Sequence, residues 1–195
     1  MPSSITVVKS TAKVGAGSVA KELAVAVGAS IFMAACAHVT VPLAFSPVPL
    51  TMQPFGVLIL ALVLGSRRSA AALALYILEG VAGLPVFSPA GPGGLLQLLG
   101  PTGGYLMAYP FAAFAAGWIY ERGKSAINAV AACICAEVIF LSAGMLWLAA
   151  VTHVTLGRAM VLAMIPYIPG EILKTFAAVT LAQRWNKLTA VAIPK

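Results

Sequence analysis

Long apolar runs that are interrupted by Pro/Gly-rich stretches form the dominant pattern of the chain. Between Glu22 and Arg67 lie 44 residues without a formal charge, and between Arg68 and Glu121 lie 52 residues in which Glu79 is the only charged one. A helix that crosses a membrane needs about 20 mostly apolar residues, so each gap is too long for one helix. Each gap also contains a Pro/Gly-rich break near its middle, which divides it into two helices.

The pattern therefore predicts six membrane-spanning helices in a single membrane domain, residues 1–195. The expected spans are about 22–41, 53–66, 69–83, 102–121, 124–150 and 169–186. The loop VPLAFSPVPLTM follows the first span, the loop GLPVFSPAGPGGLLQLLGP follows the third, and a short helix from Gly157 to Ile165 can form before the last. The expected fold class is all-α, a polytopic integral membrane protein.

Composition excludes the main alternatives to a membrane protein. Hydrophobic residues make up 61% of the chain, charged residues 9%, and there is no aspartate. A soluble domain is about half apolar and about a quarter charged, so a water-soluble enzyme is excluded. Disorder is excluded by the same apolar excess.

The distribution of basic residues predicts the orientation in the membrane. Ten of the twelve fall on one side of the predicted spans: Lys9, Lys13, Lys21, Arg67, Arg68, Arg122, Lys124, Arg184, Lys187 and Lys195. Positive charge stays cytoplasmic, so both termini and the segment 1–21 are predicted inside the cell. The segment 1–21 lacks the apolar core of a signal peptide. The basic residues that give the net charge of +7 are thus explained by the orientation of the chain in the cell membrane. No nucleic-acid partner is needed to explain them, and none is expected.

Four ionisable side chains fall within the predicted spans: Glu79, Glu137, Glu171 and Lys174. Each unpaired charge at the centre of a membrane helix costs about 2.5–3.5 kcal/mol on insertion scales. By helix rise, Glu79 lies about 15 Å and Glu137 about 20 Å from the inner surface. Glu171 and Lys174 are three residues apart and share one helix face. Such residues face an interior or line a cavity, so we expect a polar pocket open to the outside.

Two interpretations of these charges remain open at this point. In one, Glu171 and Lys174 only neutralise each other, and the other two glutamates are protonated or hydrogen-bonded. In the other, all four bind a ligand under an ordered cap formed by residues 84–105, with Phe87 and Tyr105 packed on it. The glutamates also permit a proton relay.

Several catalytic and metal-binding patterns are absent from the sequence. It contains no GxxxxGK[ST] phosphate loop, GxSxG elbow or HExxH motif, so an enzyme and intrinsic ATP hydrolysis are not expected. Cys36, Cys133 and Cys135 lack metal-ligand spacing, and His38 and His153 are isolated, so neither a metal nor a cofactor is expected. Small residues at Ala26, Ser30 and Ala34 repeat every four positions, a spacing that lets another helix approach closely.

Three motifs give the chain a resemblance to a known family. The run VPLAFSPVPLTMQPFGVLILALVLGSRRSAAALALYILEGVAGLPVF, then GPTGGYL, then PYIPGEILK resemble the biotin-specific S components, BioY type, of energy-coupling-factor (ECF) transporters. The resemblance covers nearly the whole chain from the first to the last helix. It implies a six-helix membrane subunit that captures biotin from outside. It further implies partners, a membrane scaffold subunit and two ATPase subunits.

The resemblance also implies a set of site residues. The acidic-x-x-Lys pair of the family falls on Glu171 and Lys174, with Glu where Asp is common. Gln53 follows PVPLT, Glu79 precedes GxxGLPVF, and Tyr105 is the aromatic of GPTGGYL. The predicted biotin-binding residues are Gln53, Glu79, Phe87, Tyr105, Glu137, Glu171 and Lys174. The resemblance also assigns Ala26, Ser30 and Ala34, or the neighbouring face of the same helix, to docking of the scaffold.

The ligand implied by the resemblance suits these side chains. A glutamate can accept hydrogen bonds from the two ureido N–H groups of biotin, and Lys174 can meet the ureido oxygen or the valerate. Two other functions remain as alternatives: a proton-coupled or solitary secondary transporter of biotin or a similar vitamin, and a membrane-embedded enzyme. No inverted repeat favours the first, and no nucleophile–base pair favours the second.

Overall fold

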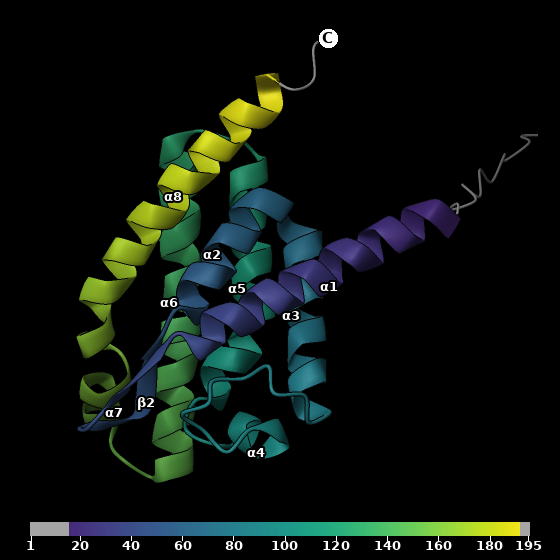
Figure 1. The fold of residues 1–195 in the computed structure, drawn as a ribbon. Helices are drawn as coiled ribbons and strands as arrows, with labels where there is room; N and C mark the ends of the chain where they lie inside the picture. Colours follow the sequence, from purple (N-terminus) through teal and green to yellow (C-terminus); the bar gives the residue numbers. More distant parts are fainter. Residues whose placement is uncertain (1–15, 192–195) are drawn as a thin grey trace, which may run out of the picture.

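A computed structural model describes residues 16–191 of the chain, which form a helical bundle with one β-hairpin (Figure 1). In chain order the elements are α1 (Ala16–His38), β1 (Thr40–Leu43), β2 (Ser46–Thr51), α2 (Gln53–Leu64), α3 (Ser66–Val81), α4 (Gly94–Leu99), α5 (Gly103–Glu121), α6 (Ala126–Thr152), α7 (Leu156–Ala163), the 3-10 turn η1 (Ile165–Tyr167) and α8 (Ile168–Val191).

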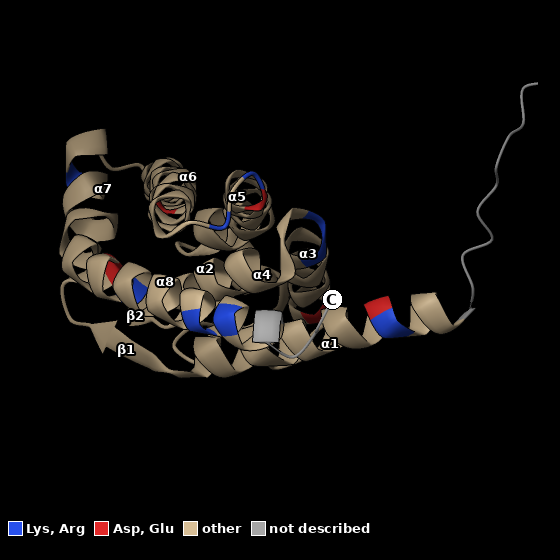
Figure 2. Cartoon of the chain, turned by 90° about the horizontal axis from the view of Figure 1, so that it is seen from above, with Lys and Arg blue, Asp and Glu red and all other residues tan. Residues whose placement is uncertain are grey.

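The helices are arranged in two layers with α2 between them. Seen from above, α6, α5 and α3 form one layer, and α8 and α1 lie on the other side of α2 (Figure 2). α5 lies in the middle of its layer and packs against α3, α6 and α2. Its inward face carries the buried alanines Ala112, Ala113 and Ala116. Small side chains let helices approach closely, which is how helices associate in membranes.

The two ends of the bundle differ in character. The turn between α2 and α3, the turn between α5 and α6, and the last turns of α8 lie at one end, the upper one in Figure 1. We call this the basic end, because it carries Arg67, Arg68, Arg122, Lys124, Arg184 and Lys187. The hairpin, α4 and α7 lie at the opposite end (Figure 1).

The hairpin corrects the expectation of an all-α fold with a loop at VPLAFSPVPLTM. β1 and β2 pair antiparallel, with Thr40 opposite Thr51 and Val41 opposite Leu50, and the pairing is irregular at Pro42. Proline cannot donate to a sheet ladder, so it is confined to edge strands and irregular positions. Both strands of a two-stranded sheet are edge strands, so they tolerate the prolines of VPLAFSPVPLTM. The same prolines had led to the prediction of a loop.

The helix boundaries also differ from the predicted spans, by up to three residues for the middle helices and by more for the first and the last. The first helix runs from Ala16 to His38 instead of 22–41, because the weakly polar start is helical and Thr40 already pairs in the hairpin. The last helix runs from Ile168 to Val191 instead of 169–186. The predicted loop before α5 contains the short helix α4. Most of the predicted segment 1–21, with Lys9 and Lys13, lies outside the described residues, as does Lys195.

Part of the bundle is long and apolar enough to cross a membrane. Three stretches of the described chain are long and apolar enough to cross a membrane: Gly17–His38, Ala126–Thr152 and Leu156–Thr189. The helix Gln53–Leu64 is apolar but has 12 residues, about 18 Å at the α-helical rise, which is shorter than a hydrocarbon core of about 30 Å. The count of six spans and the orientation of the termini stay predictions.

We predict that Gly117→Ala destabilises the bundle. A Cβ atom at Gly117 would lie 2.4 Å from the backbone N of Ser66 and 2.5 Å from its Cα, and backbone cannot rotate away. Overpacking of this kind costs about 1–3 kcal/mol, which thermal unfolding in detergent measures. Gly28→Ala is the control, because no atom lies within 4 Å of the added methyl. Equal midpoints for the two variants would contradict the tight packing of α5 on the α2–α3 turn.

Candidate ligand-binding site

A cavity lies at the end of the bundle opposite the basic end, beneath the hairpin and the α4 segment. The space between its lining atoms amounts to about 490 Å³, part of which is open solvent. Its lining comes from the hairpin, α2, the α4 segment, α5, α6, η1 and α8: Val48, Pro49, Thr51, Gln53, Pro54, Ser88, Gln97, Thr102, Tyr105, Leu106, Tyr109, Phe140, Leu141, Tyr167, Glu171 and Lys174.

The charged centre of this cavity is the pair Glu171–Lys174. The Lys174 Nζ donates to Glu171 Oε1 at 2.7 Å, and the two side chains are 8% and 3% exposed. Within the described chain, the other carboxylate oxygen, Glu171 Oε2, is buried and accepts no hydrogen bond. A buried acceptor without a donor costs free energy, so this oxygen is set to accept from a ligand.

The local sequence explains how the pair is held. Pro166 and Pro169 lie in η1 and the first turn of α8, where the missing proline N–H has no helical partner to lose. Glu171 then falls in the first turn of α8, where the positive end of the helix dipole favours a carboxylate. The spacing of three residues places Lys174 one turn later on the same face.

A polar cluster at the start of α2 forms another wall of the cavity. Gln53 is buried, and its Nε2 donates to the Tyr76 hydroxyl at 2.9 Å. The Gln53 Oε1 accepts from the Thr51 hydroxyl at 3.2 Å. These bonds fix the amide and leave the Gln53 and Thr51 side chains at the cavity surface.

Aromatic rings form the apolar part of the lining. Tyr109 and Phe140 meet edge to face, with ring centroids 5.8 Å apart. The Tyr105 ring lies directly over Gly144, where a Cβ would come within 2.2 Å of the ring, and its hydroxyl donates to the Ala163 carbonyl. The Tyr167 hydroxyl donates to the Val48 carbonyl at 2.5 Å. These hydroxyl bonds hold the two rings and tie α5 to α7 and η1 to the hairpin.

Four of the seven predicted ligand residues line this cavity: Gln53, Tyr105, Glu171 and Lys174. Phe87, Glu79 and Glu137 are not among its lining residues. Phe87 is buried against α3, where its ring fills the space above Gly80 and meets Tyr76 edge to face at 5.4 Å. It therefore anchors the cap on the bundle.

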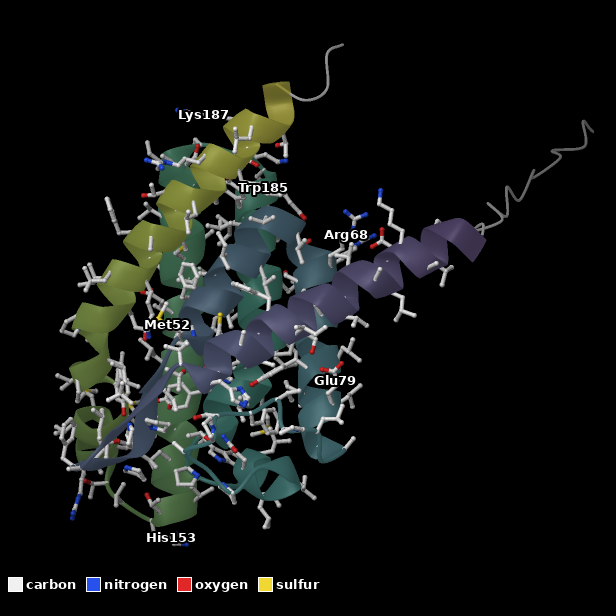
Figure 3. The ribbon with its side chains drawn as sticks, viewed as in Figure 1. Met52, Arg68, Glu79, His153, Trp185 and Lys187 are labelled. Carbon is white, nitrogen blue, oxygen red and sulfur yellow. The ribbon has the colours of Figure 1, made fainter. Side chains whose placement is uncertain are left out.

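The other two glutamates make helix-to-helix hydrogen bonds. The Ser30 hydroxyl on α1 donates to Glu79 on α3, which lies on the side of α3 that faces α1 (Figure 3). The Thr175 hydroxyl on α8 donates to Glu137 Oε1 on α6 at 2.5 Å. A half-buried carboxylate in a helix interface is stabilised by such a bond, so both residues have a packing role in this structure.

The predicted docking face of α1 also packs inside the bundle. Ser30 is fully buried, and Ala26 and Ala34 are half-buried against the core. Leu23, Val27, Gly28 and Ile31 are exposed on the side of α1 that adjoins this small-residue face. Sequence spacing identified the periodicity of small residues but could not decide which face of the helix meets α3.

The structure adds lining residues that the sequence analysis missed: Thr51, Ser88, Gln97, Thr102, Tyr109 and Tyr167. Gln97 is buried in α4, and its Oε1 accepts from the Gly93 backbone N–H at 3.1 Å. The Ser88 hydroxyl donates to the Thr40 hydroxyl of the hairpin at 3.1 Å. Both residues lie within the predicted cap, residues 84–105. A polar side chain in this Pro/Gly-rich loop was the only sequence feature that could have identified them as lining residues.

The arrangement suits binding better than catalysis or metal coordination. Within residues 16–191, no three His, Cys, Asp or Glu side chains lie close enough together to hold a metal ion. The cavity combines one carboxylate acceptor, one ammonium, amide and hydroxyl groups and an aromatic wall. A mostly apolar lining with a few placed polar groups is typical of small-molecule sites.

Comparisons with known proteins point to one family. The model of the BioY family matches residues 6–191. A protein named "Probable biotin transporter BioY" from Pyrococcus horikoshii is 36% identical over 144 residues, which cover 74% of this chain and 84% of that protein. The biotin transporter BioY of Thermotoga maritima is 34% identical over 152 residues, 78% of this chain and 88% of its own.

A solved structure has the same fold. The crystal structure of the S-component for biotin from an ECF-type ABC transporter superposes with a TM-score of 0.80, covering 89% of this chain and 94% of that chain. Sequence identity between the two is 22%. This chain therefore shares its overall fold with that S-component.

We predict that Lys174→Ala strongly destabilises the protein in detergent. Removal of one partner of a buried ion pair leaves Glu171 charged and uncompensated, which costs about 3–5 kcal/mol. Thermal unfolding of the purified chain measures the loss. The double variant Glu171→Gln/Lys174→Ala removes both charges and is expected to recover much of the midpoint. An unchanged midpoint for Lys174→Ala would show that the pair is peripheral to stability.

Proposed function

The chain belongs to the BioY family, and we propose from this premise that it is a biotin-uptake protein whose cavity binds biotin. In this role it is the substrate-binding membrane subunit of an ECF transporter. The observation that carries the assignment is the buried Glu171 Oε2, which accepts no hydrogen bond within the described chain and lies in a cavity beside Lys174.

The functional groups of biotin match the polar groups of the cavity. The ureido ring has two N–H donors and one carbonyl acceptor, and the valerate ends in a carboxylate. Glu171 Oε2 accepts an N–H of the ureido ring, which satisfies the unpaired oxygen. Lys174 has three donors and uses one for Glu171, so its ammonium can also meet the ureido oxygen or the valerate.

The apolar part of biotin matches the aromatic wall. The thioether ring needs an apolar surface, and Tyr105, Tyr109 and Phe140 supply one between the charged pair and α6. Sulfur packs favourably against the edges of aromatic rings. Thr51 and Gln53 complete the polar side of the site. Selectivity arises because an analogue without ureido N–H groups leaves buried protein groups unpaired.

The position of the cavity supports uptake from outside. It lies at the end of the bundle opposite the basic end, and basic residues favour the cytoplasmic side. In the proposed topology both termini are cytoplasmic, six helices span the cell membrane and biotin enters from the external face. The hairpin and the α4 segment then form the outer cover of the site.

The proposed energy source is a set of partner subunits. The sequence has no GxxxxGK[ST] motif, so ATP hydrolysis is assigned to ATPase subunits that act through a membrane scaffold. The exposed face of α1, with Leu23, Val27, Gly28 and Ile31, is the proposed scaffold contact. Gly28 has open space around its Cα, so a partner helix can approach the backbone there.

We predict that Glu171→Gln weakens biotin binding about 10–100-fold. A hydrogen bond to a charged group contributes about 1.5–3 kcal/mol, and each 1.4 kcal/mol corresponds to a factor of ten. Calorimetric titration of the detergent-solubilised protein measures the change. Glu137→Gln is the matched control, because Glu137 lies in a helix interface outside the cavity lining, and its affinity is expected to equal the wild type.

Titration with two further ligands tests whether the ureido group is recognised. Desthiobiotin keeps the ureido group and is expected to bind more tightly than an analogue without it. Equal affinities for these two ligands, or equal effects of Glu171→Gln and Glu137→Gln, would contradict the assignment of Glu171. No binding of biotin by the wild-type protein would reject the proposed substrate.

We predict that Gly28→Leu disrupts assembly while leaving biotin affinity unchanged. Gly28 lies on the exposed side of α1, and a Cβ atom added there meets no atom within 4 Å. Co-purification with coexpressed scaffold and ATPase subunits measures assembly, and Ala131→Leu on the exposed side of α6 is the control. Normal assembly of Gly28→Leu would move the contact to another face. Uptake that needs a proton gradient and no ATPase would favour the secondary-transport alternative.

A further inference from the structure

The exposed face of α5 carries a stripe of aromatic side chains that ends in a cation. Phe111, Phe114 and Trp118 are 71%, 46% and 48% exposed, and Arg122 caps the helix at the basic end. Their spacings of three and four residues place all four on one side of α5. The Arg122 guanidinium lies over the Trp118 ring, 3.5 Å from its centroid.

Two grooves adjoin this stripe. One lies at the basic end, between α5 and the α2–α3 turn, and is lined by Leu64, Ser66, Arg67, Arg68, Phe114, Trp118 and Glu121. The other is almost wholly apolar, lies between α5 and α6, and is lined by Gly104, Met107, Ala108, Phe111, Ile139, Ala143, Leu146, Trp147 and Ala150. The stripe joins a basic groove to an apolar one.

The charges in the basic groove leave a net positive site. The Glu121 carboxylate is already engaged, because it accepts from the Ser66 backbone N–H at 2.7 Å and from the Ser66 hydroxyl at 2.9 Å. Arg68 lies beside α1 and is paired with Glu22 (Figure 3). Within residues 16–191, Arg67 has no anionic partner. Arg67 is therefore free to meet an anion, and Arg122 adds a second positive charge over the ring of Trp118, which lines the groove.

The length of the stripe matches one leaflet of a bilayer. From Trp118 to Met107 the helix advances eleven residues, about 16 Å at the α-helical rise. Half of a hydrocarbon core of about 30 Å is about 15 Å. An acyl chain that starts beside Trp118 thus reaches the apolar groove at Met107 near the middle of the membrane.

We propose that this stripe and its two grooves bind one anionic phospholipid of the leaflet at the basic end. The phosphate of the headgroup meets Arg67 and Arg122, and an acyl chain lies along Phe114 and Phe111 into the apolar groove. Basic pockets between membrane helices hold anionic headgroups, and Trp lies at the headgroup level of a bilayer. The site shares no residue with the ligand cavity or with the exposed face of α1.

The experiment is native mass spectrometry of the full chain from micelles that contain equal amounts of phosphatidylglycerol and phosphatidylcholine. The wild type is expected to retain one phosphatidylglycerol in preference to phosphatidylcholine. Arg67→Gln/Arg122→Gln is expected to bind phosphatidylglycerol about thirtyfold more weakly, because each arginine near an anionic lipid contributes about fivefold. Arg184→Gln/Lys187→Gln is the matched control, with the same charge loss on α8.

Each alternative outcome identifies a different cause and overturns the proposal. Equal retention of the two lipids would show that the headgroup is not recognised. Equal losses in the two double variants would show diffuse attraction to the whole basic end. Displacement of the lipid by inorganic phosphate at a similar concentration would show a free-anion site. Calorimetric titration with biotin serves as the folding control, since neither double variant touches the cavity.

Discussion

The buried ion pair between Glu171 and Lys174 is the constraint on which the rest of the structure depends. Two charges at membrane depth are costly unless they are paired and surrounded by polar groups. The pair meets the first requirement through its short hydrogen bond at the start of α8. The second requirement, polar surroundings, is met by hydroxyl and amide groups from distant parts of the chain. The hairpin, the α4 segment and the start of α2 bring these groups to one cavity.

Irregular backbone around this cavity is held by side-chain hydroxyl groups. Tyr105 donates to the Ala163 carbonyl, Tyr167 donates to the Val48 carbonyl, and Ser46 donates to the Leu162 carbonyl at 2.7 Å. Non-helical backbone at membrane depth is stable only where protein groups satisfy it or where it lines a cavity. These bonds therefore explain how the hairpin and the α7–η1 segment are held at the end of the apolar bundle opposite the basic end.

The two ends of the bundle carry different surfaces. The candidate ligand cavity lies at the end with the hairpin, whereas the cations and the exposed aromatic stripe of α5 lie toward the other end. Between them, Glu79 bonds α3 to α1 and Glu137 bonds α6 to α8. These two hydrogen bonds join α1 and α8 to the layer formed by α3, α5 and α6. They therefore couple the positions of α1 and α8 to that layer.

The sequence by itself determined the membrane class, the position of most helices, the pairing of Glu171 with Lys174 and the family resemblance. Those properties depend on local apolar runs, short spacings and contiguous motifs. Only the tertiary structure decided that VPLAFSPVPLTM forms a hairpin, that Ser30 faces Glu79, and that Phe87 and Glu137 lie outside the cavity lining. The physical reason is that a uniformly apolar helix carries little information about which face packs inward, so contacts between distant segments select the face.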